Sequence, residues 1–175
     1  MNYSFDQIIE RRNAYSTKWL KFSDNEVIPM WIADMDFSCP EEITNAMHKH
    51  LDKGVFGYTD TPESLTEIFI DKIKENSGWE IKKEWVVWVP GGVVGLNVAC
   101  KTTLAPGEIV MVPSPIYAPF TEAPENMERG FIKTDLKDVN GRLELDFESV
   151  KDLLSEDTKM FSFCNPEKSK DEHEY

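Results

Sequence analysis

A glycine-rich turn from Val89 to Gly95 (VPGGVVG) is the strongest local sign of chemistry in the sequence. It follows an apolar run, Trp85 to Val89, that is typical of a strand buried on both faces, and it precedes an expected helix from about Gly95 to Thr103. Glycines let backbone N–H groups approach a ligand closely, and a helix start attracts negative charge, so this arrangement suits a phosphate. The turn lacks the residues of a nucleoside-triphosphate loop and the spacing of a dinucleotide motif, which favours the phosphate of a small cofactor. A tight turn that only packs the helix on the strand is the alternative.

Two further loops follow expected strands. The loop Ser114 to Phe120 (SPIYAPF) comes after the strand Ile109 to Val112, and Asn165 comes after the strand Lys159 to Cys164. Ligands of α/β proteins bind at the carboxyl ends of parallel strands, so all three loops are expected at one edge of the sheet. Prolines on both sides hold the backbone of Tyr117, which suits a ring that stacks on another ring. Core packing or plain loop rigidity is the alternative for the tyrosine, and a plain turn is the alternative for the asparagine.

An acidic pair, Asp34 and Asp36, ends the otherwise apolar segment Val27 to Phe37 (VIPMWIADMDF), which we interpret as extended. A magnesium site is one interpretation of the pair, although such sites usually also need substrate phosphates and further carboxylates. His48 and His50 lie two positions apart on an expected helix. They therefore face different directions and do not form a ligand pair.

Helices and strands must position these loops. After Gly78 the sequence alternates strand, helix and strand twice, which predicts an α/β domain with a largely parallel sheet. The residues from Tyr15 to Asp24 look irregular. Further helices are expected at the chain start behind a capping box of Ser4 and Gln7, from Pro40 to Gly54, from Thr61 to Gly78 and from Asp146 to Leu154. Further strands are expected from Arg129 to Thr134 and from Arg142 to Leu145, on either side of an Asn140-Gly141 turn.

Composition excludes several classes of protein. The chain has 175 residues, of which 41% are apolar and 29% charged, as in a folded globular protein. Its net charge of -13 would repel nucleic acid and anionic membranes. Three widely spaced cysteines do not suggest a disulfide framework, so a reducing cytoplasm is expected. The first ten residues do not resemble a signal peptide, and no apolar run reaches the roughly 20 residues that a bilayer needs.

Five motifs taken together resemble the pyridoxal-phosphate (PLP) enzymes of aminotransferase fold type I, and in particular the MalY/PatB group of cystathionine β-lyases. The similarity runs in order from about residue 3 to residue 166. Each motif alone is only modestly specific, but the occurrence of all five in the same order makes the resemblance specific. The motifs are WIADMDF (31–37), GYTDTPESL (57–65), VPGGVVGLN (89–97), PGEIVMVPSPIYAPF (106–120) and FCNP (163–166).

The resemblance implies a role for several residues. The backbone N–H groups of Gly92 and Val93 would hold the cofactor phosphate, although the family more often has Val-Val-Pro at 92–94. Tyr117 would stack on the pyridine ring, and Asn165 would hydrogen-bond its phenolic oxygen. Because family members are dimers that share their active sites, Tyr58 would reach the phosphate in the neighbouring subunit.

The resemblance also implies a substrate and a reaction. The stretch from Ala33 to Phe37, including Asp34, would line the pocket near the carboxylate of an amino acid, with a sulfur-containing substrate expected. The family's reaction uses the cofactor as an electron sink and releases a thiol, pyruvate and ammonia. An aminotransferase is the alternative reaction type within the same fold.

The sequence departs from the family after Asn165-Pro166. The Schiff-base lysine, which binds the cofactor and moves the proton, and the aspartate and arginine that assist it, lie beyond this motif in the family. Residues 167–175 instead form a divergent polar tail, as a frameshift or early stop would leave it. We therefore expect an incomplete fold type I domain: a 1–53 small-domain and dimer-arm segment and a 54–166 first half of the cofactor-binding domain. A non-catalytic fragment or interaction subunit and an independent phosphate-binding module are the alternatives.

Overall fold

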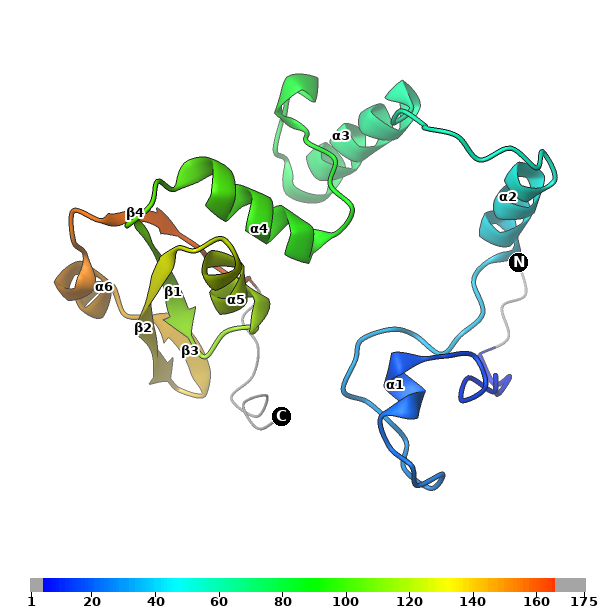
Figure 1. Ribbon diagram of the computed structural model, residues 1–175, viewed down its shortest axis with the longest axis horizontal. Coiled ribbons are helices and arrows are strands. Elements are labelled where there is room, and N and C mark those ends of the chain that lie inside the picture. Colours follow the sequence, from blue (N-terminus) through cyan, green and yellow to red (C-terminus); the bar gives the residue numbers. More distant parts are fainter. Residues whose placement is uncertain (1–4, 166–175) are drawn as a thin grey trace. The chain divides into compact units, whose positions relative to one another are not determined.

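The computed structural model describes residues 5–165, which form parts of two compact units (Figure 1). Unit 1 is Met1–Asp60 and unit 2 is Thr61–Tyr175. The sequence placed its division after residue 53, whereas the two units divide after residue 60. Pro166 and the expected polar tail at 167–175 lie outside the described residues.

Within its described residues, 5–60, unit 1 contains two helices, α1 (Thr17–Leu20) and α2 (Glu41–Leu51). The helix expected behind the Ser4–Gln7 capping box is wrong, since residues 5–10 are not helical. Ile8 is 96% exposed, whereas Phe5 of the same stripe packs edge-on against Phe37, so the three apolar residues do not form one helical face. An isolated helix this short is also marginal in water. The segment expected to be irregular contains α1 instead.

The expected helix from Pro40 to Gly54 is confirmed as α2. Pro40 precedes its first turn, and Glu41 and Glu42 lie beside the positive end of the helix dipole. Gly54 follows with a φ of 66°, a left-handed conformation that ends the helix at little cost for glycine. The local signals were therefore sufficient to place this helix.

Unit 2 begins with α3 (Glu63–Ser77), which confirms the second expected helix and ends at Gly78 in a left-handed conformation. The strand expected at 85–89 is wrong. A 3₁₀ turn, η1 (Lys83–Trp85), starts this segment, and the residues after it pair with no strand of the described chain. Trp88 instead packs on α3: its Nε1 donates to Thr66 Oγ1 at 3.1 Å and its ring lies 5.5 Å from that of Phe69.

The sheet of unit 2 has four strands in the order β3-β2-β1-β4. The central strand β1 (Ile109–Ser114) pairs in parallel with β2 (Gly130–Val139) and with β4 (Thr158–Phe161). The short β3 (Arg142–Leu145) pairs antiparallel with β2. The prediction of an α/β domain with a mostly parallel sheet is confirmed.

Helices lie on both faces of the sheet. Val110 and Val112 are fully buried on one face, in a core with Cys100 and Leu104 from the end of α4 (Gly92–Thr103) and Ala123 from α5 (Pro119–Asn126). Strand alternation turns Met111, also fully buried, to the opposite face. On that face Thr134 of β2 contacts Ser149 of α6 (Phe147–Leu153) through their hydroxyls at 3.2 Å. Unit 2 is therefore layered as helix, sheet and helix (Figure 1).

Turns and caps account for the remaining elements. Asn140 and Gly141 both have positive φ, 54° and 82°, which confirms the expected tight turn between β2 and β3. The carboxylate of Asp146 accepts from the backbone N–H groups of Glu148 and Ser149, which confirms the predicted cap of α6. The sequence missed α5, because Pro119 at its start and Pro124 inside it hide the helical pattern.

Gly130, the first residue of β2, offers a test of this packing. A Cβ added there would lie 2.7 Å from Cγ2 of Ile109, its partner on β1. The branched side chain of Ile109 cannot swing aside freely. We expect Gly130→Ala to lower the free energy of unfolding by about 1–3 kcal/mol in a urea titration. Gly57→Ala is the control, because a Cβ added at Gly57 would meet no atom within 4 Å. It should change the free energy of unfolding by less than Gly130→Ala does. Gly107→Ala is unsuitable, because Gly107 has a positive φ. Equal stability of Gly130→Ala and the wild type would contradict this packing.

Candidate functional site

The start of α4 presents backbone N–H groups without a competing side chain. Gly91 precedes the helix with a φ of 121°, a backbone conformation that is accessible chiefly to glycine. The first-turn N–H groups of Gly92, Val93 and Val94 lack carbonyl partners within the helix, as at any helix start. No side chain caps this terminus and no acidic residue lies in the first turn. The terminus therefore carries an unopposed partial positive charge that would attract an anion.

The loop after β1 carries Tyr117. The Ser114–Pro115 peptide is cis, and α5 begins at Pro119, so the tyrosine lies in a short connection between two regular elements. The backbone carbonyl of Tyr117 accepts from the N–H of Phe120 at 3.0 Å. Its side chain is 42% exposed, so part of the ring faces solvent. The alternative in which this tyrosine is a core residue is wrong.

The end of β4 brings Asn165 to the same edge of the sheet. The N–H of Ser162 donates to Met111 O at 2.9 Å, which continues the pairing of β4 with β1 one residue beyond the strand. Since β1 and β4 are parallel neighbours, the segments that follow them leave the sheet at one edge. Asn165 is exposed there and is the last residue that the structure describes.

The start of α4 lies towards that edge by topology. The helix ends at Thr103, a short connection follows, and β1 begins at Ile109, so helix and strand run in opposite directions while the end of the helix packs on β1 (Figure 1). The beginning of α4 therefore lies towards the carboxyl end of β1. The sequence expected three strands to feed this edge; the structure has two strands and a helix start, because 86–89 forms no strand.

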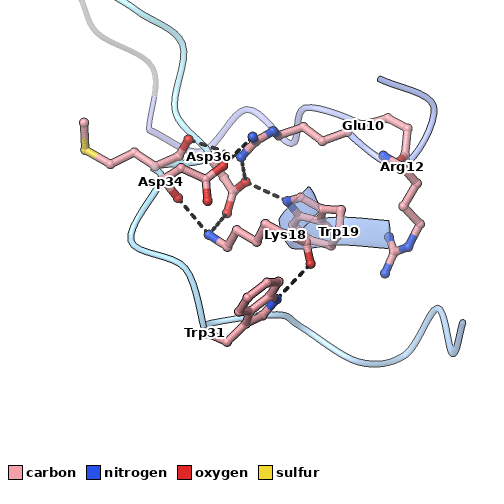
Figure 2. A network of polar contacts seen from close by, with 9 residues as sticks. Glu10, Arg12, Lys18, Trp19, Trp31, Asp34 and Asp36 are labelled. Carbon is pink, nitrogen blue, oxygen red and sulfur yellow. Dashed lines mark hydrogen bonds and ion pairs between the residues drawn. The ribbon is translucent and has the colours of Figure 1, made fainter. Parts of the chain in front are cut away.

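Unit 1 contains a cluster of charged side chains around the Asp34–Asp36 pair (Figure 2). Arg11 contacts both carboxylates at 2.5 Å, through Nη2 to Asp34 and Nη1 to Asp36. Asp36 also accepts from Lys18 Nζ and from Trp19 Nε1, each at 2.7 Å. Two carboxylates thus face two cations. In residues 5–165 no group of three or more His, Cys, Asp or Glu side chains is arranged to hold a metal ion.

The sequence missed the cationic half of this cluster, because Arg11 and Lys18 lie 16 to 25 positions before their partners. The side chain of Lys18 is only 8% exposed. Hydrogen bonds from Lys18, Trp19 and Arg11 hold the pKa of Asp36 far below its usual range.

The lowered pKa of Asp36 predicts an acid-sensitive unit 1. A carboxylate with a depressed pKa in the folded state stabilises the fold above the unfolded value, near about 4, and this contribution is lost as the pH falls below it. Because Trp19 donates to this carboxylate, its fluorescence should change as the cluster opens. We expect Asp36→Asn to lower the stability of unit 1 at pH 7 and to flatten its dependence on pH between about 5 and 2. Identical acid titrations of the variant and the wild type would contradict the cluster.

Three other predicted site residues lie in unit 1. Tyr58 is fully exposed, and Ala33 is exposed. Asp34 is partly exposed, and its carboxylate is engaged by Arg11. In unit 2, Gly92 and Val93 are exposed at the start of α4. The structure therefore brings the segments of Gly92, Tyr117 and Asn165 towards one edge of unit 2, and describes Ala33, Asp34 and Tyr58 separately in unit 1.

The model of the family described as aminotransferase class I and II matches residues 25–168. The chain belongs to this family. It is 34% identical over 168 residues to cystathionine beta-lyase PatB of Bacillus subtilis, covering 93% of this chain and 43% of PatB. The chain is thus similar to a β-lyase of the group that its motifs resemble.

Two solved structures share its fold. Cystalysin from Treponema denticola, a structure that contains pyridoxal 5'-phosphate, matches with a TM-score of 0.86 and 33% identity over 95% of this chain and 44% of cystalysin. The PLP-bound C-S lyase from Staphylococcus hominis in complex with L-cycloserine matches with a TM-score of 0.84 and 31% identity over 94% of this chain and 43% of the lyase. The fold is that of the fold type I enzymes, and the chain spans less than half the length of these relatives. Within residues 5–165 no helix has the length and apolar content to cross a bilayer.

Proposed function

We propose that this chain supplies the phosphate- and ring-binding part of a PLP-dependent C–S β-lyase of the cystathionine β-lyase type, which releases a thiol, pyruvate and ammonia. One observation carries the proposal: an uncapped helix start lies towards the sheet edge that the loops of Tyr117 and Asn165 leave. The similarity to PatB and to the PLP-bound C-S lyase favours a lyase over an aminotransferase within the family.

The start of α4 fits a phosphate. Its first-turn N–H groups, those of Gly92 and Val93 among them, would donate to phosphate oxygens, and the helix dipole would favour the negative charge. A Cβ added at Gly92 would meet no atom within 4 Å, so there is open space beside the first residue of the helix. The N–H of Gly91 is not among the free donors, since it donates to Val89 O at 2.8 Å. The absence of an acidic residue in the first turn leaves this positive end uncompensated.

Two side chains would orient the aromatic ring of the cofactor. Tyr117, partly exposed in a connection held by a proline on each side, would stack on the ring and exclude water from one face. The side-chain amide of Asn165 would donate to the phenolic oxygen of the cofactor. When bound, the cofactor supplies an electron sink for the carbanion that forms at the α-carbon of an amino acid.

The remaining groups would come from unit 1 and from a second subunit. Ala33 and Asp34 would line the pocket for an amino acid, and a sulfur-containing amino acid fits a lyase that expels a thiol. Tyr58, fully exposed in this chain, would donate its hydroxyl to the phosphate held by a partner in a homodimer. None of the described residues carries the role of the Schiff-base lysine, so we assign no catalytic residue to them.

Cofactor binding is tested by comparing PLP with pyridoxal, which lacks the phosphate. Titrations of the purified chain, followed by quenching of tryptophan fluorescence, should give a dissociation constant for pyridoxal about 100-fold higher than for PLP, because charge-assisted hydrogen bonds to the phosphate are lost. Equal affinities, or no binding of PLP, would contradict the proposal.

Borohydride reduction of the same complex, followed by peptide mass mapping, addresses catalysis. We expect no lysine of this chain to carry the cofactor and no pyruvate to form from L-cystathionine. A lysine labelled in high yield, with pyruvate release, would show a complete catalyst. Binding of PLP without pyruvate release is the result expected of a chain that supplies only the cofactor-binding part of the lyase.

A further inference from the structure

We propose that Lys18 is a positioning residue that fixes the conformation of the segment Ala33–Phe37 so that it can receive the carboxylate of an amino acid. The inference rests on the substrate-lining role of this segment under the proposed function. Lys18 itself touches neither substrate nor cofactor in this proposal. It acts through the backbone of Asp34 and the side chain of Asp36.

The contacts of Lys18 extend in two directions (Figure 2). Its Nζ donates to Asp34 O at 2.9 Å and to Asp36 Oδ2 at 2.7 Å, so one ammonium group joins the backbone and a side chain of the same segment. Its own carbonyl accepts from Trp31 Nε1 at 3.2 Å. Lys18 is 7% exposed as a residue, although lysine is almost never fully buried unless it is paired. Hydrogen bonds therefore hold Lys18 both at its ammonium group and at its backbone carbonyl.

Arg11 and Trp19 restrain the same segment. Arg11 Nη1 lies 3.4 Å from Met35 O and 2.5 Å from Asp36 Oδ1, and Trp19 Nε1 donates to the same carboxylate. Asp36 thus accepts from three different side chains, which fixes its rotamer. Lys18 alone combines low exposure with contacts to both Asp34 and Asp36 through a single atom, which makes it the centre of the cluster.

The direction of the backbone links this cluster to binding. The peptide bonds of this segment are trans, so the N–H of each peptide points away from its carbonyl oxygen. The carbonyl of Asp34 points to Lys18, and the N–H of Met35 in the same peptide therefore points away from the cation. An anionic carboxylate approaching from that side would meet the N–H of Met35 as a hydrogen-bond donor. Losing Lys18 would free this peptide to rotate.

The first test measures amide hydrogen exchange of the ligand-free chain. In Lys18→Met we expect exchange of the amides of residues 33–37 to rise about tenfold, while those of α2 keep their wild-type rates, since the charged hydrogen bonds to Asp34 O and to the Asp36 carboxylate that hold the segment are lost. Lys18→Arg, which can still donate to both acceptors, should restore most of the protection. Lys53→Met is the matched control, because Lys53 is exposed in the same unit. Unchanged exchange at 33–37 in Lys18→Met would overturn the proposal.

The second test separates this inference from the proposed function. In the PLP-loaded chain, Lys18→Met should raise the dissociation constant of L-cystathionine about tenfold and leave that of PLP unchanged, and Lys18→Arg should restore the wild-type value. Raised exchange with unchanged L-cystathionine affinity would overturn the positioning role while the proposed function stands. A wild-type chain that does not bind PLP would refute the proposed function, and the exchange rates would still decide whether Lys18 orders the segment. If Lys18→Met unfolds unit 1, the same comparisons are made with Lys18→Arg and Trp31→Phe. Trp31→Phe removes the donor to the Lys18 carbonyl. Wild-type exchange at 33–37 in Trp31→Phe would then count against the proposal.

Discussion

Replacing Gly92 with aspartate is expected to abolish measurable binding of PLP without destabilising the protein. A carboxylate at the first position of α4 would lie where the proposed phosphate binds. Two like charges about 4 Å apart at an effective dielectric constant of about 20 repel by about 4 kcal/mol, which corresponds to a dissociation constant about 1,000-fold higher. An acidic side chain at a helix start is stabilising, so the thermal midpoint should stay equal or rise. The same substitution is thus expected to change binding and stability in different directions.

Val98→Asp is the matched control for Gly92→Asp. Val98 lies on the same helix beyond the first turn and is 45% exposed, so an aspartate there adds the same charge away from the helix start. Its effect on PLP affinity should be less than about tenfold, because solvent screens the added charge. Equal affinities for PLP in Gly92→Asp and the wild type would remove the start of α4 from the binding site.

Replacing Val110 with aspartate is expected to abolish cooperative unfolding of unit 2. Val110, the second residue of β1, is fully buried and belongs to the core with Cys100, Leu104 and Ala123. An unpaired carboxylate there would lose its hydration without a partner, at a cost of several kcal/mol. Because the whole stability of a domain is about 5–15 kcal/mol, the variant should show no sharp transition in urea.

Val139→Asp distinguishes burial from the change of residue type. Val139 is the last residue of β2 and is 40% exposed, so the same substitution should lower the urea midpoint only slightly. A cooperative transition in Val110→Asp with a midpoint close to that of Val139→Asp would contradict the position of β1 at the centre of the sheet.

The sequence predicted the elements whose signals are local. Pro40 with the acidic first turn of α2, the Asn140-Gly141 turn and the Asp146 cap each depend on residues a few positions apart, and the structure has all three. The apolar composition of β1 was sufficient because both of its neighbouring strands belong to the chain. These features need no knowledge of the tertiary fold.

The misses have a common physical cause. The run at 85–89 has the composition of a buried strand, but a strand also needs a hydrogen-bonding neighbour, and the described chain offers Trp88 a place on α3 instead. The residues of the helix expected near Ile8 have helical spacing, but Phe5 packs on the distant Phe37 while Ile8 stays exposed. Long-range partners also explain why Arg11 and Lys18 were missed, since a contact between residues so far apart leaves no local pattern.

Of the candidate site, the sequence predicted the glycine-rich helix start and the two loops at a common sheet edge. The parallel pairing of β1 with β4 accounts for the second part, because it brings the segments that follow both strands to one edge. The detailed surroundings of Asp34 and Asp36 could not be predicted, since they depend on how the segment before α2 folds back on α1.

The most direct test of the central claim is a two-dimensional NMR titration of the ¹⁵N-labelled chain with PLP. We expect the backbone amides of Gly92 and Val93 to shift most, together with the amide of Tyr117 and the side-chain NH₂ of Asn165, and pyridoxal without phosphate to leave the first two unchanged. Shifts confined to other residues, or no shifts at PLP concentrations that saturate the fluorescence titration, would contradict the claim that these three segments form one cofactor site.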